Sequence, residues 1–153
     1  PELLYDRALA ADKLGKFKLL EQDLRKLIKM KPDSAHAYNA LGYSLAERGS
    51  QLPEALKLIK KAVELSPEDP YIMDSLGWVH YRMGNLVEGL NYLNLAFAAR
   101  PDAEIAAHLG EVLWMKGAKD DAKNIWRFAL EKDPDNEVLL ETLQRFIKKK
   151  IIE

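Results

Sequence analysis

Three residues whose side chains could bind a metal ion stand at helical spacing in the last third of the chain. Glu104, His108 and Glu111 lie at i, i+4 and i+7, so a helix would place two carboxylates and an imidazole on one face. Such a triplet arises often by chance in helical sequences. The sequence therefore predicts no metal site and no cofactor, and a metal-dependent helical enzyme is kept only as an alternative.

No catalytic motif is found elsewhere in the chain. The sequence contains no HExxH, P-loop or GxSxG motif, and no predicted strand that could carry one. It has no cysteine, which excludes disulfides and thiolate metal ligands. His80 falls on the apolar register of its segment and is expected to be a buried core residue. We therefore expect no enzymatic activity.

Composition narrows the class of partner. The 23 basic and 24 acidic residues give a net charge of −1, which argues against nucleic acid, because its binding requires several phosphates to be neutralised. No apolar run approaches the roughly 18 residues that a membrane span needs, so this chain is not expected to insert into a membrane itself. Composition therefore argues against nucleic acid as a partner and against membrane insertion by this chain.

The elements that must carry these residues follow from a periodic pattern. Four prolines recur at separations of 35, 34 and 33 residues, and an acidic residue follows each of them: Pro32, Pro67, Pro101 and Pro134. Self-similarity at this period is typical of helical repeat arrays. Alignment on the prolines gives repeats at 1–34, 35–69, 70–102 and 103–136. Residues 137–153 follow as a capping helix, expected to run to about residue 150, and a tail.

Small residues recur at fixed places within the repeats. Gly42, Gly77 and Gly110 stand inside predicted helices, where glycine costs about 1 kcal/mol relative to alanine, so a close helix–helix approach is expected there. Further glycines mark the predicted end of each first helix, as C-caps prefer. The first repeat departs from this pattern at Arg7 and Leu20, and its first helix is expected to pack less closely.

This pattern resembles the tetratricopeptide repeat (TPR) across essentially the whole chain. The resemblance implies an all-α fold, an α-α superhelix of four helix pairs plus a C-terminal capping helix. A pentatricopeptide array, which reads RNA, has a similar period. It would require a basic surface and a regular two-residue base code, and the sequence shows neither.

The resemblance also implies a binding groove, because the first helix of each TPR pair lines the concave face. Carried over residue by residue, the predicted groove comprises His36, Asn39, Tyr43, Tyr71, Asp74, Trp78, Tyr81, Arg82, Glu111, Trp114 and Met115. Tyr, Trp and Arg are frequent interface hot spots, although some of these aromatic residues could instead belong to the core. The basic clamp of chaperone-binding TPR domains is absent, since the corresponding helices carry Tyr5, Leu9, Tyr71 and Ser75. Asp12, Glu47 and Glu104 favour a ligand held by apolar side chains together with a basic residue.

A narrower resemblance rests on three strings and the pair Ile125-Trp126. Residues 39–46, 73–78 and 106–114 look like the C-terminal repeats of TPR lipoproteins from proteobacterial outer membranes. That group implies a periplasmic scaffold, held by a lipid anchor on a longer parent chain, which brings a processing protease to cell-wall hydrolases. Because the chain begins at Pro1 without Met, we expect it to be a piece of such a parent. The alternatives are a cytoplasmic location, and a structural spacer or dimerisation array with no groove ligand; the oligomeric state stays open.

Overall fold

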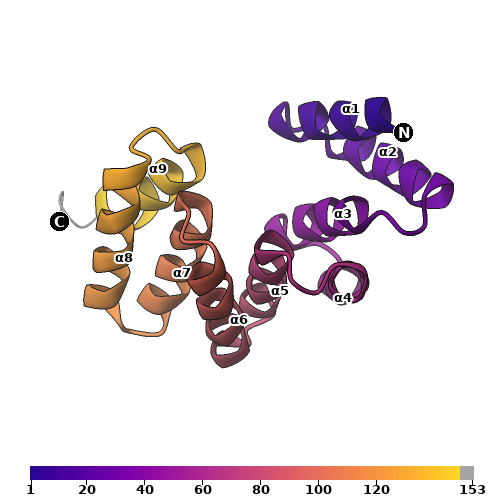
Figure 1. Ribbon diagram of the computed structural model, residues 1–153. Coiled ribbons are helices and arrows are strands. Elements are labelled where there is room, and N and C mark those ends of the chain that lie inside the picture. The colour runs from indigo at the N-terminus through magenta and orange to yellow at the C-terminus, as the bar shows by residue number, and fades with distance from the viewer. Residues whose placement is uncertain (149–153) are drawn as a thin grey trace.

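The computed structural model describes residues 1–148 as a row of antiparallel helix pairs (Figure 1). The pairs are α1 (Glu2–Lys13) with α2 (Phe17–Met30), α3 (Ala35–Glu47) with α4 (Leu52–Leu65), α5 (Pro70–Arg82) with α6 (Leu86–Ala99), and α7 (Ala103–Met115) with α8 (Lys119–Lys132). The helix α9 (Glu137–Leu143) and a π-helical turn, η1 (Gln144–Lys148), follow. This architecture confirms the predicted all-α superhelix.

The segment around each repeat proline ends one helix and starts the next. The proline pushes the residue before it out of the helical region, and a polar residue one or two positions later caps the following helix. Ser34 accepts a hydrogen bond from the Ala37 amide, and Asp102 accepts one from the Ile105 amide. Within a pair, the first helix ends on a left-handed glycine, as at Gly117, where φ is +99°.

Close approach of the two helices in a pair explains the glycines inside the first helices. A Cβ built on Gly77 would lie 2.8 Å from the Leu93 side chain and 2.9 Å from the Gly89 carbonyl oxygen. Trp126 fills the equivalent space beside Gly110 and is only 1% exposed. His80 is buried at 7% exposure, which confirms its expected place in the core.

The first repeat replaces an apolar contact with an ion pair. Arg7 donates two hydrogen bonds of 2.7 Å to the carboxylate of Asp23, which is almost fully buried. The fourth repeat has Leu109 and Ile125 packed together at the corresponding places. The Arg7 side chain, which departs from the repeat pattern, therefore has a partner on α2, and the neighbouring Ala8 is fully buried.

The C-terminal cap is helical as far as the structure describes it. The α-helix α9 ends at Leu143, and the π-helical turn η1 continues the helical run to Lys148. This turn carries Phe146 to within 5.8 Å of the rings of both Trp114 and Trp126, and it brings Arg145 2.7 Å from Glu111. Residues 149–153 of the predicted cap and tail lie outside the described residues.

The row of pairs curves, so that α1 and α9 lie at its two ends with α5 and α6 between them (Figure 1). The first helices of successive pairs contact one another, α3 with α5 and α5 with α7, and α9 continues this row against α7. Among residues 1–148, no helix combines the length and hydropathy that a bilayer crossing requires.

Candidate functional site: the concave groove

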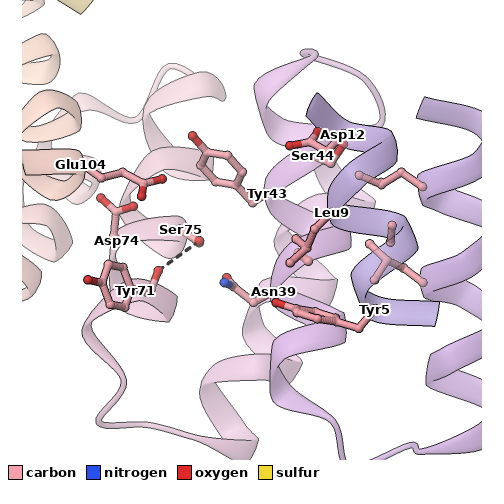
Figure 2. A pocket seen from close by; sticks show the side chains of 14 residues that line it. Tyr5, Leu9, Asp12, Asn39, Tyr43, Ser44, Tyr71, Asp74, Ser75 and Glu104 are labelled. Carbon is pink, nitrogen blue, oxygen red and sulfur yellow. Dashed lines mark hydrogen bonds between the residues drawn. The ribbon is translucent and has the colours of Figure 1, made fainter. Parts of the chain in front are cut away.

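The first helices of all four pairs contribute side chains to one cavity of 330 Å³. Figure 2 shows Tyr71, Asp74 and Glu104 on one side, and Tyr5, Leu9 and Asp12 on the other, with Asn39 and Tyr43 between them. The walls therefore come from α5 and α7 on one side, α1 on the other and α3 between. Among the described residues that line this cavity there is no Lys, Arg or His.

A second cavity, of 400 Å³, continues the concave face toward the C-terminus. It shares Asp12, Tyr43 and Glu104 with the first cavity, so the two form a single groove, which we call the concave groove. Carboxylates also dominate its lining, through Glu47, Glu137 and Glu141. The cationic residues that line it are His108 and Arg145, and both are ion-paired.

A buried hydrogen-bonded chain forms part of the groove wall. His108 Nδ1 lies 2.9 Å from both carboxylate oxygens of Asp74, and its Nε2 lies 3.0 Å from the Tyr43 hydroxyl. Burial favours the neutral imidazole, but the charge and hydrogen bond of Asp74 outweigh it and raise the pKa of His108 to about 9. Burial also raises the pKa of the Asp74 carboxyl, against the opposing effect of His108.

Two further carboxylates hold aromatic side chains of the predicted groove. The Trp78 indole NH donates to Glu47 at 2.8 Å, and the Trp78 ring packs 4.3 Å from the His108 ring. The Tyr81 hydroxyl donates to Glu111 at 2.9 Å. Glu111 also accepts from Arg145, so one buried carboxylate joins the third repeat to the C-terminal turn.

Within residues 1–148, the groove-lining acids Asp12 and Glu104 are not ion-paired with a basic side chain in the way that Asp74 and Glu111 are. Burial raises the pKa of Asp12, and Glu47 adds to that effect while Arg48 opposes it. Burial likewise raises the pKa of Glu104, opposed by His108 and reinforced by neighbouring carboxylates such as Asp74. The electrostatic environment of both groups therefore disfavours added negative charge.

The structure divides the predicted groove residues into two sets. Those that line the groove are Asn39, Tyr43, Tyr71, Asp74 and Trp78. Those that lie outside its lining are His36, Tyr81, Arg82, Glu111, Trp114 and Met115.

The residues of the second set have identifiable surroundings. His36 lines a separate pocket at the N-terminal edge, beside Glu2. Arg82 donates to the Ala46 carbonyl at 3.0 Å, and Trp114 packs 5.7 Å from Trp126. The side chain of Met115 is exposed.

Trp78 lines the groove, but its side chain is less accessible than the prediction of an interface hot spot supposed. It is only 3% exposed, so most of its ring is covered and it serves as a wall. The more accessible apolar side chains of the first cavity are Leu9, 42% exposed, and Tyr71, 37% exposed. The role of each predicted residue in binding stays a prediction.

Sequence reasoning did not place His108, Ser44 or Arg145 in the groove. His108 entered only as a possible metal ligand with Glu104 and Glu111. Within residues 1–148 no group of three or more His, Asp and Glu side chains is arranged to hold a metal ion. The signal that could have found His108 is the buried acid Asp74, which faces it from the preceding repeat.

Comparisons with known proteins agree with this fold. A family model described as tetratricopeptide repeat matches residues 5–70 and 75–137. Over 109 residues the chain is 50% identical to the TPR repeat-containing protein PA4667 of Pseudomonas aeruginosa, a match that covers 71% of this chain and 18% of that protein.

Two solved structures are similar as well. TTC0263, a thermophilic TPR protein of Thermus thermophilus, gives a TM-score of 0.84 at 24% identity, over 99% of this chain and 81% of that one. The O-GlcNAc transferase of Thermobaculum terrenum gives 0.69 at 26% identity, over 73% of this chain and 22% of that one. The likeness to TTC0263 shows the fold alone. The chain spans less than a quarter of both PA4667 and the transferase.

Proposed function

The chain belongs to the tetratricopeptide repeat family, and on this premise we propose that its concave groove binds an extended segment of another protein. TPR arrays generally mediate protein–protein interactions. The observation that carries the proposal is the continuous groove, whose two cavities share Asp12, Tyr43 and Glu104 and are lined from α1 to α9. A groove of this length suits an extended chain better than a compact small molecule.

We further propose that the domain acts as a scaffold within a longer parent protein. The resemblance to outer-membrane TPR lipoproteins supports a periplasmic location through a parent lipid anchor, with a processing protease and cell-wall hydrolases as partners. The 50% identity to PA4667 supports kinship with a much longer bacterial TPR protein. In this role the groove holds one protein while other repeats of the parent hold the next.

Site-directed photo-cross-linking tests the groove against the alternative of a spacer or dimerisation array. A benzophenone amino acid would replace Tyr71, an exposed residue of the groove lining, in one protein. In the control protein it would replace Leu95, an exposed residue of α6 outside both cavities. Each would be irradiated in a cell-envelope extract of the source bacterium, and the cross-linked segments would be mapped by mass spectrometry.

We expect the probe at position 71 to join reproducible segments of a few proteins, and the probe at position 95 not to capture them. A processing protease or a cell-wall hydrolase among those proteins would support the scaffold role. Equal products from both positions, or none from position 71, would overturn groove binding and leave the spacer. Cross-links from position 71 only to a second copy of the chain would establish the dimerisation array instead.

A further inference from the structure

The N-terminal half of the concave groove contains hydrogen-bonding groups that the fold leaves unused. Within residues 1–148, Asn39 Oδ1 and Ser44 Oγ are buried and have no hydrogen-bond partner. Buried polar atoms are seldom left unsatisfied, because losing water without a replacement costs about 1–3 kcal/mol. Both residues line the 330 Å³ cavity, and Ser44 as a whole is only 5% exposed.

These atoms are surrounded by groups that favour a positive charge. Asp12, Asp74 and Glu104 line the same cavity, which has no basic side chain in its described lining. Asp74 is ion-paired with His108, but Asp12 and Glu104 form no salt bridge among the described residues. Tyr5 adds an aromatic ring to the lining, and the face of such a ring attracts cations, as the Tyr71 ring already attracts the Arg100 guanidinium at 5.5 Å.

The arrangement of these groups defines a place for one side chain. In Figure 2 the amide end of Asn39 extends into the space between Tyr71 and Tyr5, and the two acid-bearing walls stand on either side. An extended segment in the groove would pass Leu9 and Tyr71, whose exposed apolar surfaces could hold the methylene stem of a long side chain. The charged end would then meet oxygen acceptors.

We propose that this cavity is a subsite for a cationic side chain, lysine or arginine, of the bound segment. Its ammonium or guanidinium group would donate a hydrogen bond to one of the two unpartnered oxygens, Asn39 Oδ1 or Ser44 Oγ, which stand five residues apart on α3, and would be neutralised by Asp12 and Glu104. This inference rests on the proposed function for the presence of a bound segment. The subsite itself follows from the unpartnered polar atoms and the surrounding carboxylates.

The test is an NMR titration of the isotope-labelled chain with small amides. The probes are N-acetyl-lysine N-methylamide and N-acetyl-arginine N-methylamide, with N-acetyl-norleucine N-methylamide as the uncharged isostere of lysine. The signals followed are the Asn39 side-chain amide and the carboxyl carbons of Asp12 and Glu104. A parallel titration with magnesium chloride at matched ionic strength tests for a general counter-ion effect.

We expect saturable, millimolar binding of at least one cationic amide, about tenfold tighter than that of the norleucine amide. The stronger of the lysine and arginine probes identifies the side chain. The Asp12→Asn/Glu104→Gln variant should lose about tenfold in affinity, because both carboxylates become neutral amides of the same shape. The control Glu68→Gln, which removes an exposed acid outside both cavities, should leave the titration unchanged.

Three results would each overturn the subsite. They are equal shifts from the norleucine amide, equal shifts from magnesium, and a cation titration that the double variant does not weaken. Absence of saturable shifts from either cation would do the same. Because the titration needs no protein partner, its failure leaves groove binding to be judged by the cross-linking experiment, and a failed cross-link leaves this subsite standing.

Discussion

Replacing Gly110 by alanine tests whether the helix pairs are as closely packed as the structure indicates. In most helices this substitution stabilises, by about 1 kcal/mol, since alanine is the better helix former. Here the added Cβ would lie 2.1 Å from Nε1 of Trp126 and 2.4 Å from Cε2. Non-bonded heavy atoms prefer about 3.5–4.0 Å, so the indole would have to move by more than about 1 Å.

The surroundings of Trp126 make that movement costly. The ring lies 5.7 Å from the Trp114 ring and 5.8 Å from the Phe146 ring, and its NH donates to the Ala107 carbonyl at 3.3 Å. Overpacking of this kind costs about 1–3 kcal/mol, and a lost hydrogen bond about 1 kcal/mol more. After the propensity gain, Gly110→Ala should destabilise by about 2 kcal/mol, which lowers the melting temperature by roughly 4–8 °C.

The assay is thermal and urea unfolding followed by tryptophan fluorescence and far-UV circular dichroism. A thermodynamic cycle with Trp126→Leu isolates the clash, because in that background the alanine should recover its helix-forming advantage. Gly42→Ala is the matched comparison, since its Cβ would meet Ile59 Cγ1 at 2.6 Å and the Ala55 carbonyl oxygen at 3.0 Å, contacts less severe than those at Gly110, so its loss of stability should be smaller. An equal or higher stability of Gly110→Ala would refute the close-packing argument, as would the same loss in both backgrounds.

Three further predictions address the buried polar groups. The pKa of His108 is raised from 6.5 to about 9, so the stability that protonated His108 contributes is fully present below pH 6.5 and is lost as the pH rises through 9. Urea unfolding midpoints should therefore fall across that pH range. The midpoints of His108→Gln should fall less. Arg7→Leu should lower the melting temperature because it leaves the buried Asp23 carboxylate without its partner, whereas Arg7→Leu/Asp23→Leu should unfold at or above the wild-type temperature. Glu111→Gln should speed amide hydrogen exchange in residues 137–148 by about tenfold, with exchange in α1 unchanged, because it weakens the tie to the C-terminal turn.

The fold could be predicted from the sequence because its determinants are local and repeated. A proline that ends one helix, a polar cap just after it and a glycine that ends the next helix recur at one period. Neither the ion pair of Arg7 with Asp23 nor the π-helical turn could be predicted in this way. Each occurs once, so no neighbouring repeat reveals it, and each depends on which distant side chains the fold brings together.

The groove was predictable only in part, for a related reason. Resemblance gives the positions that face the concave side, and Asn39, Tyr43 and Asp74 do line it. The resemblance does not show which of those side chains form hydrogen bonds or ion pairs with one another. Trp78 and Tyr81 read as binding residues in the sequence, yet carboxylates from neighbouring helices hold the indole NH of one and the hydroxyl of the other.

The two halves of the groove therefore differ in what they can offer a ligand. Two groups that line the C-terminal cavity are already paired: Arg145 with Glu111, which lies outside the lining, and His108 with Asp74. On the proposed function, a bound segment would meet charged groups there that already have a partner. Asp12 and Glu104, which line both cavities, would repel an acidic segment. On the proposed binding, specificity would come from rejecting the wrong charge as much as from fitting the right side chain.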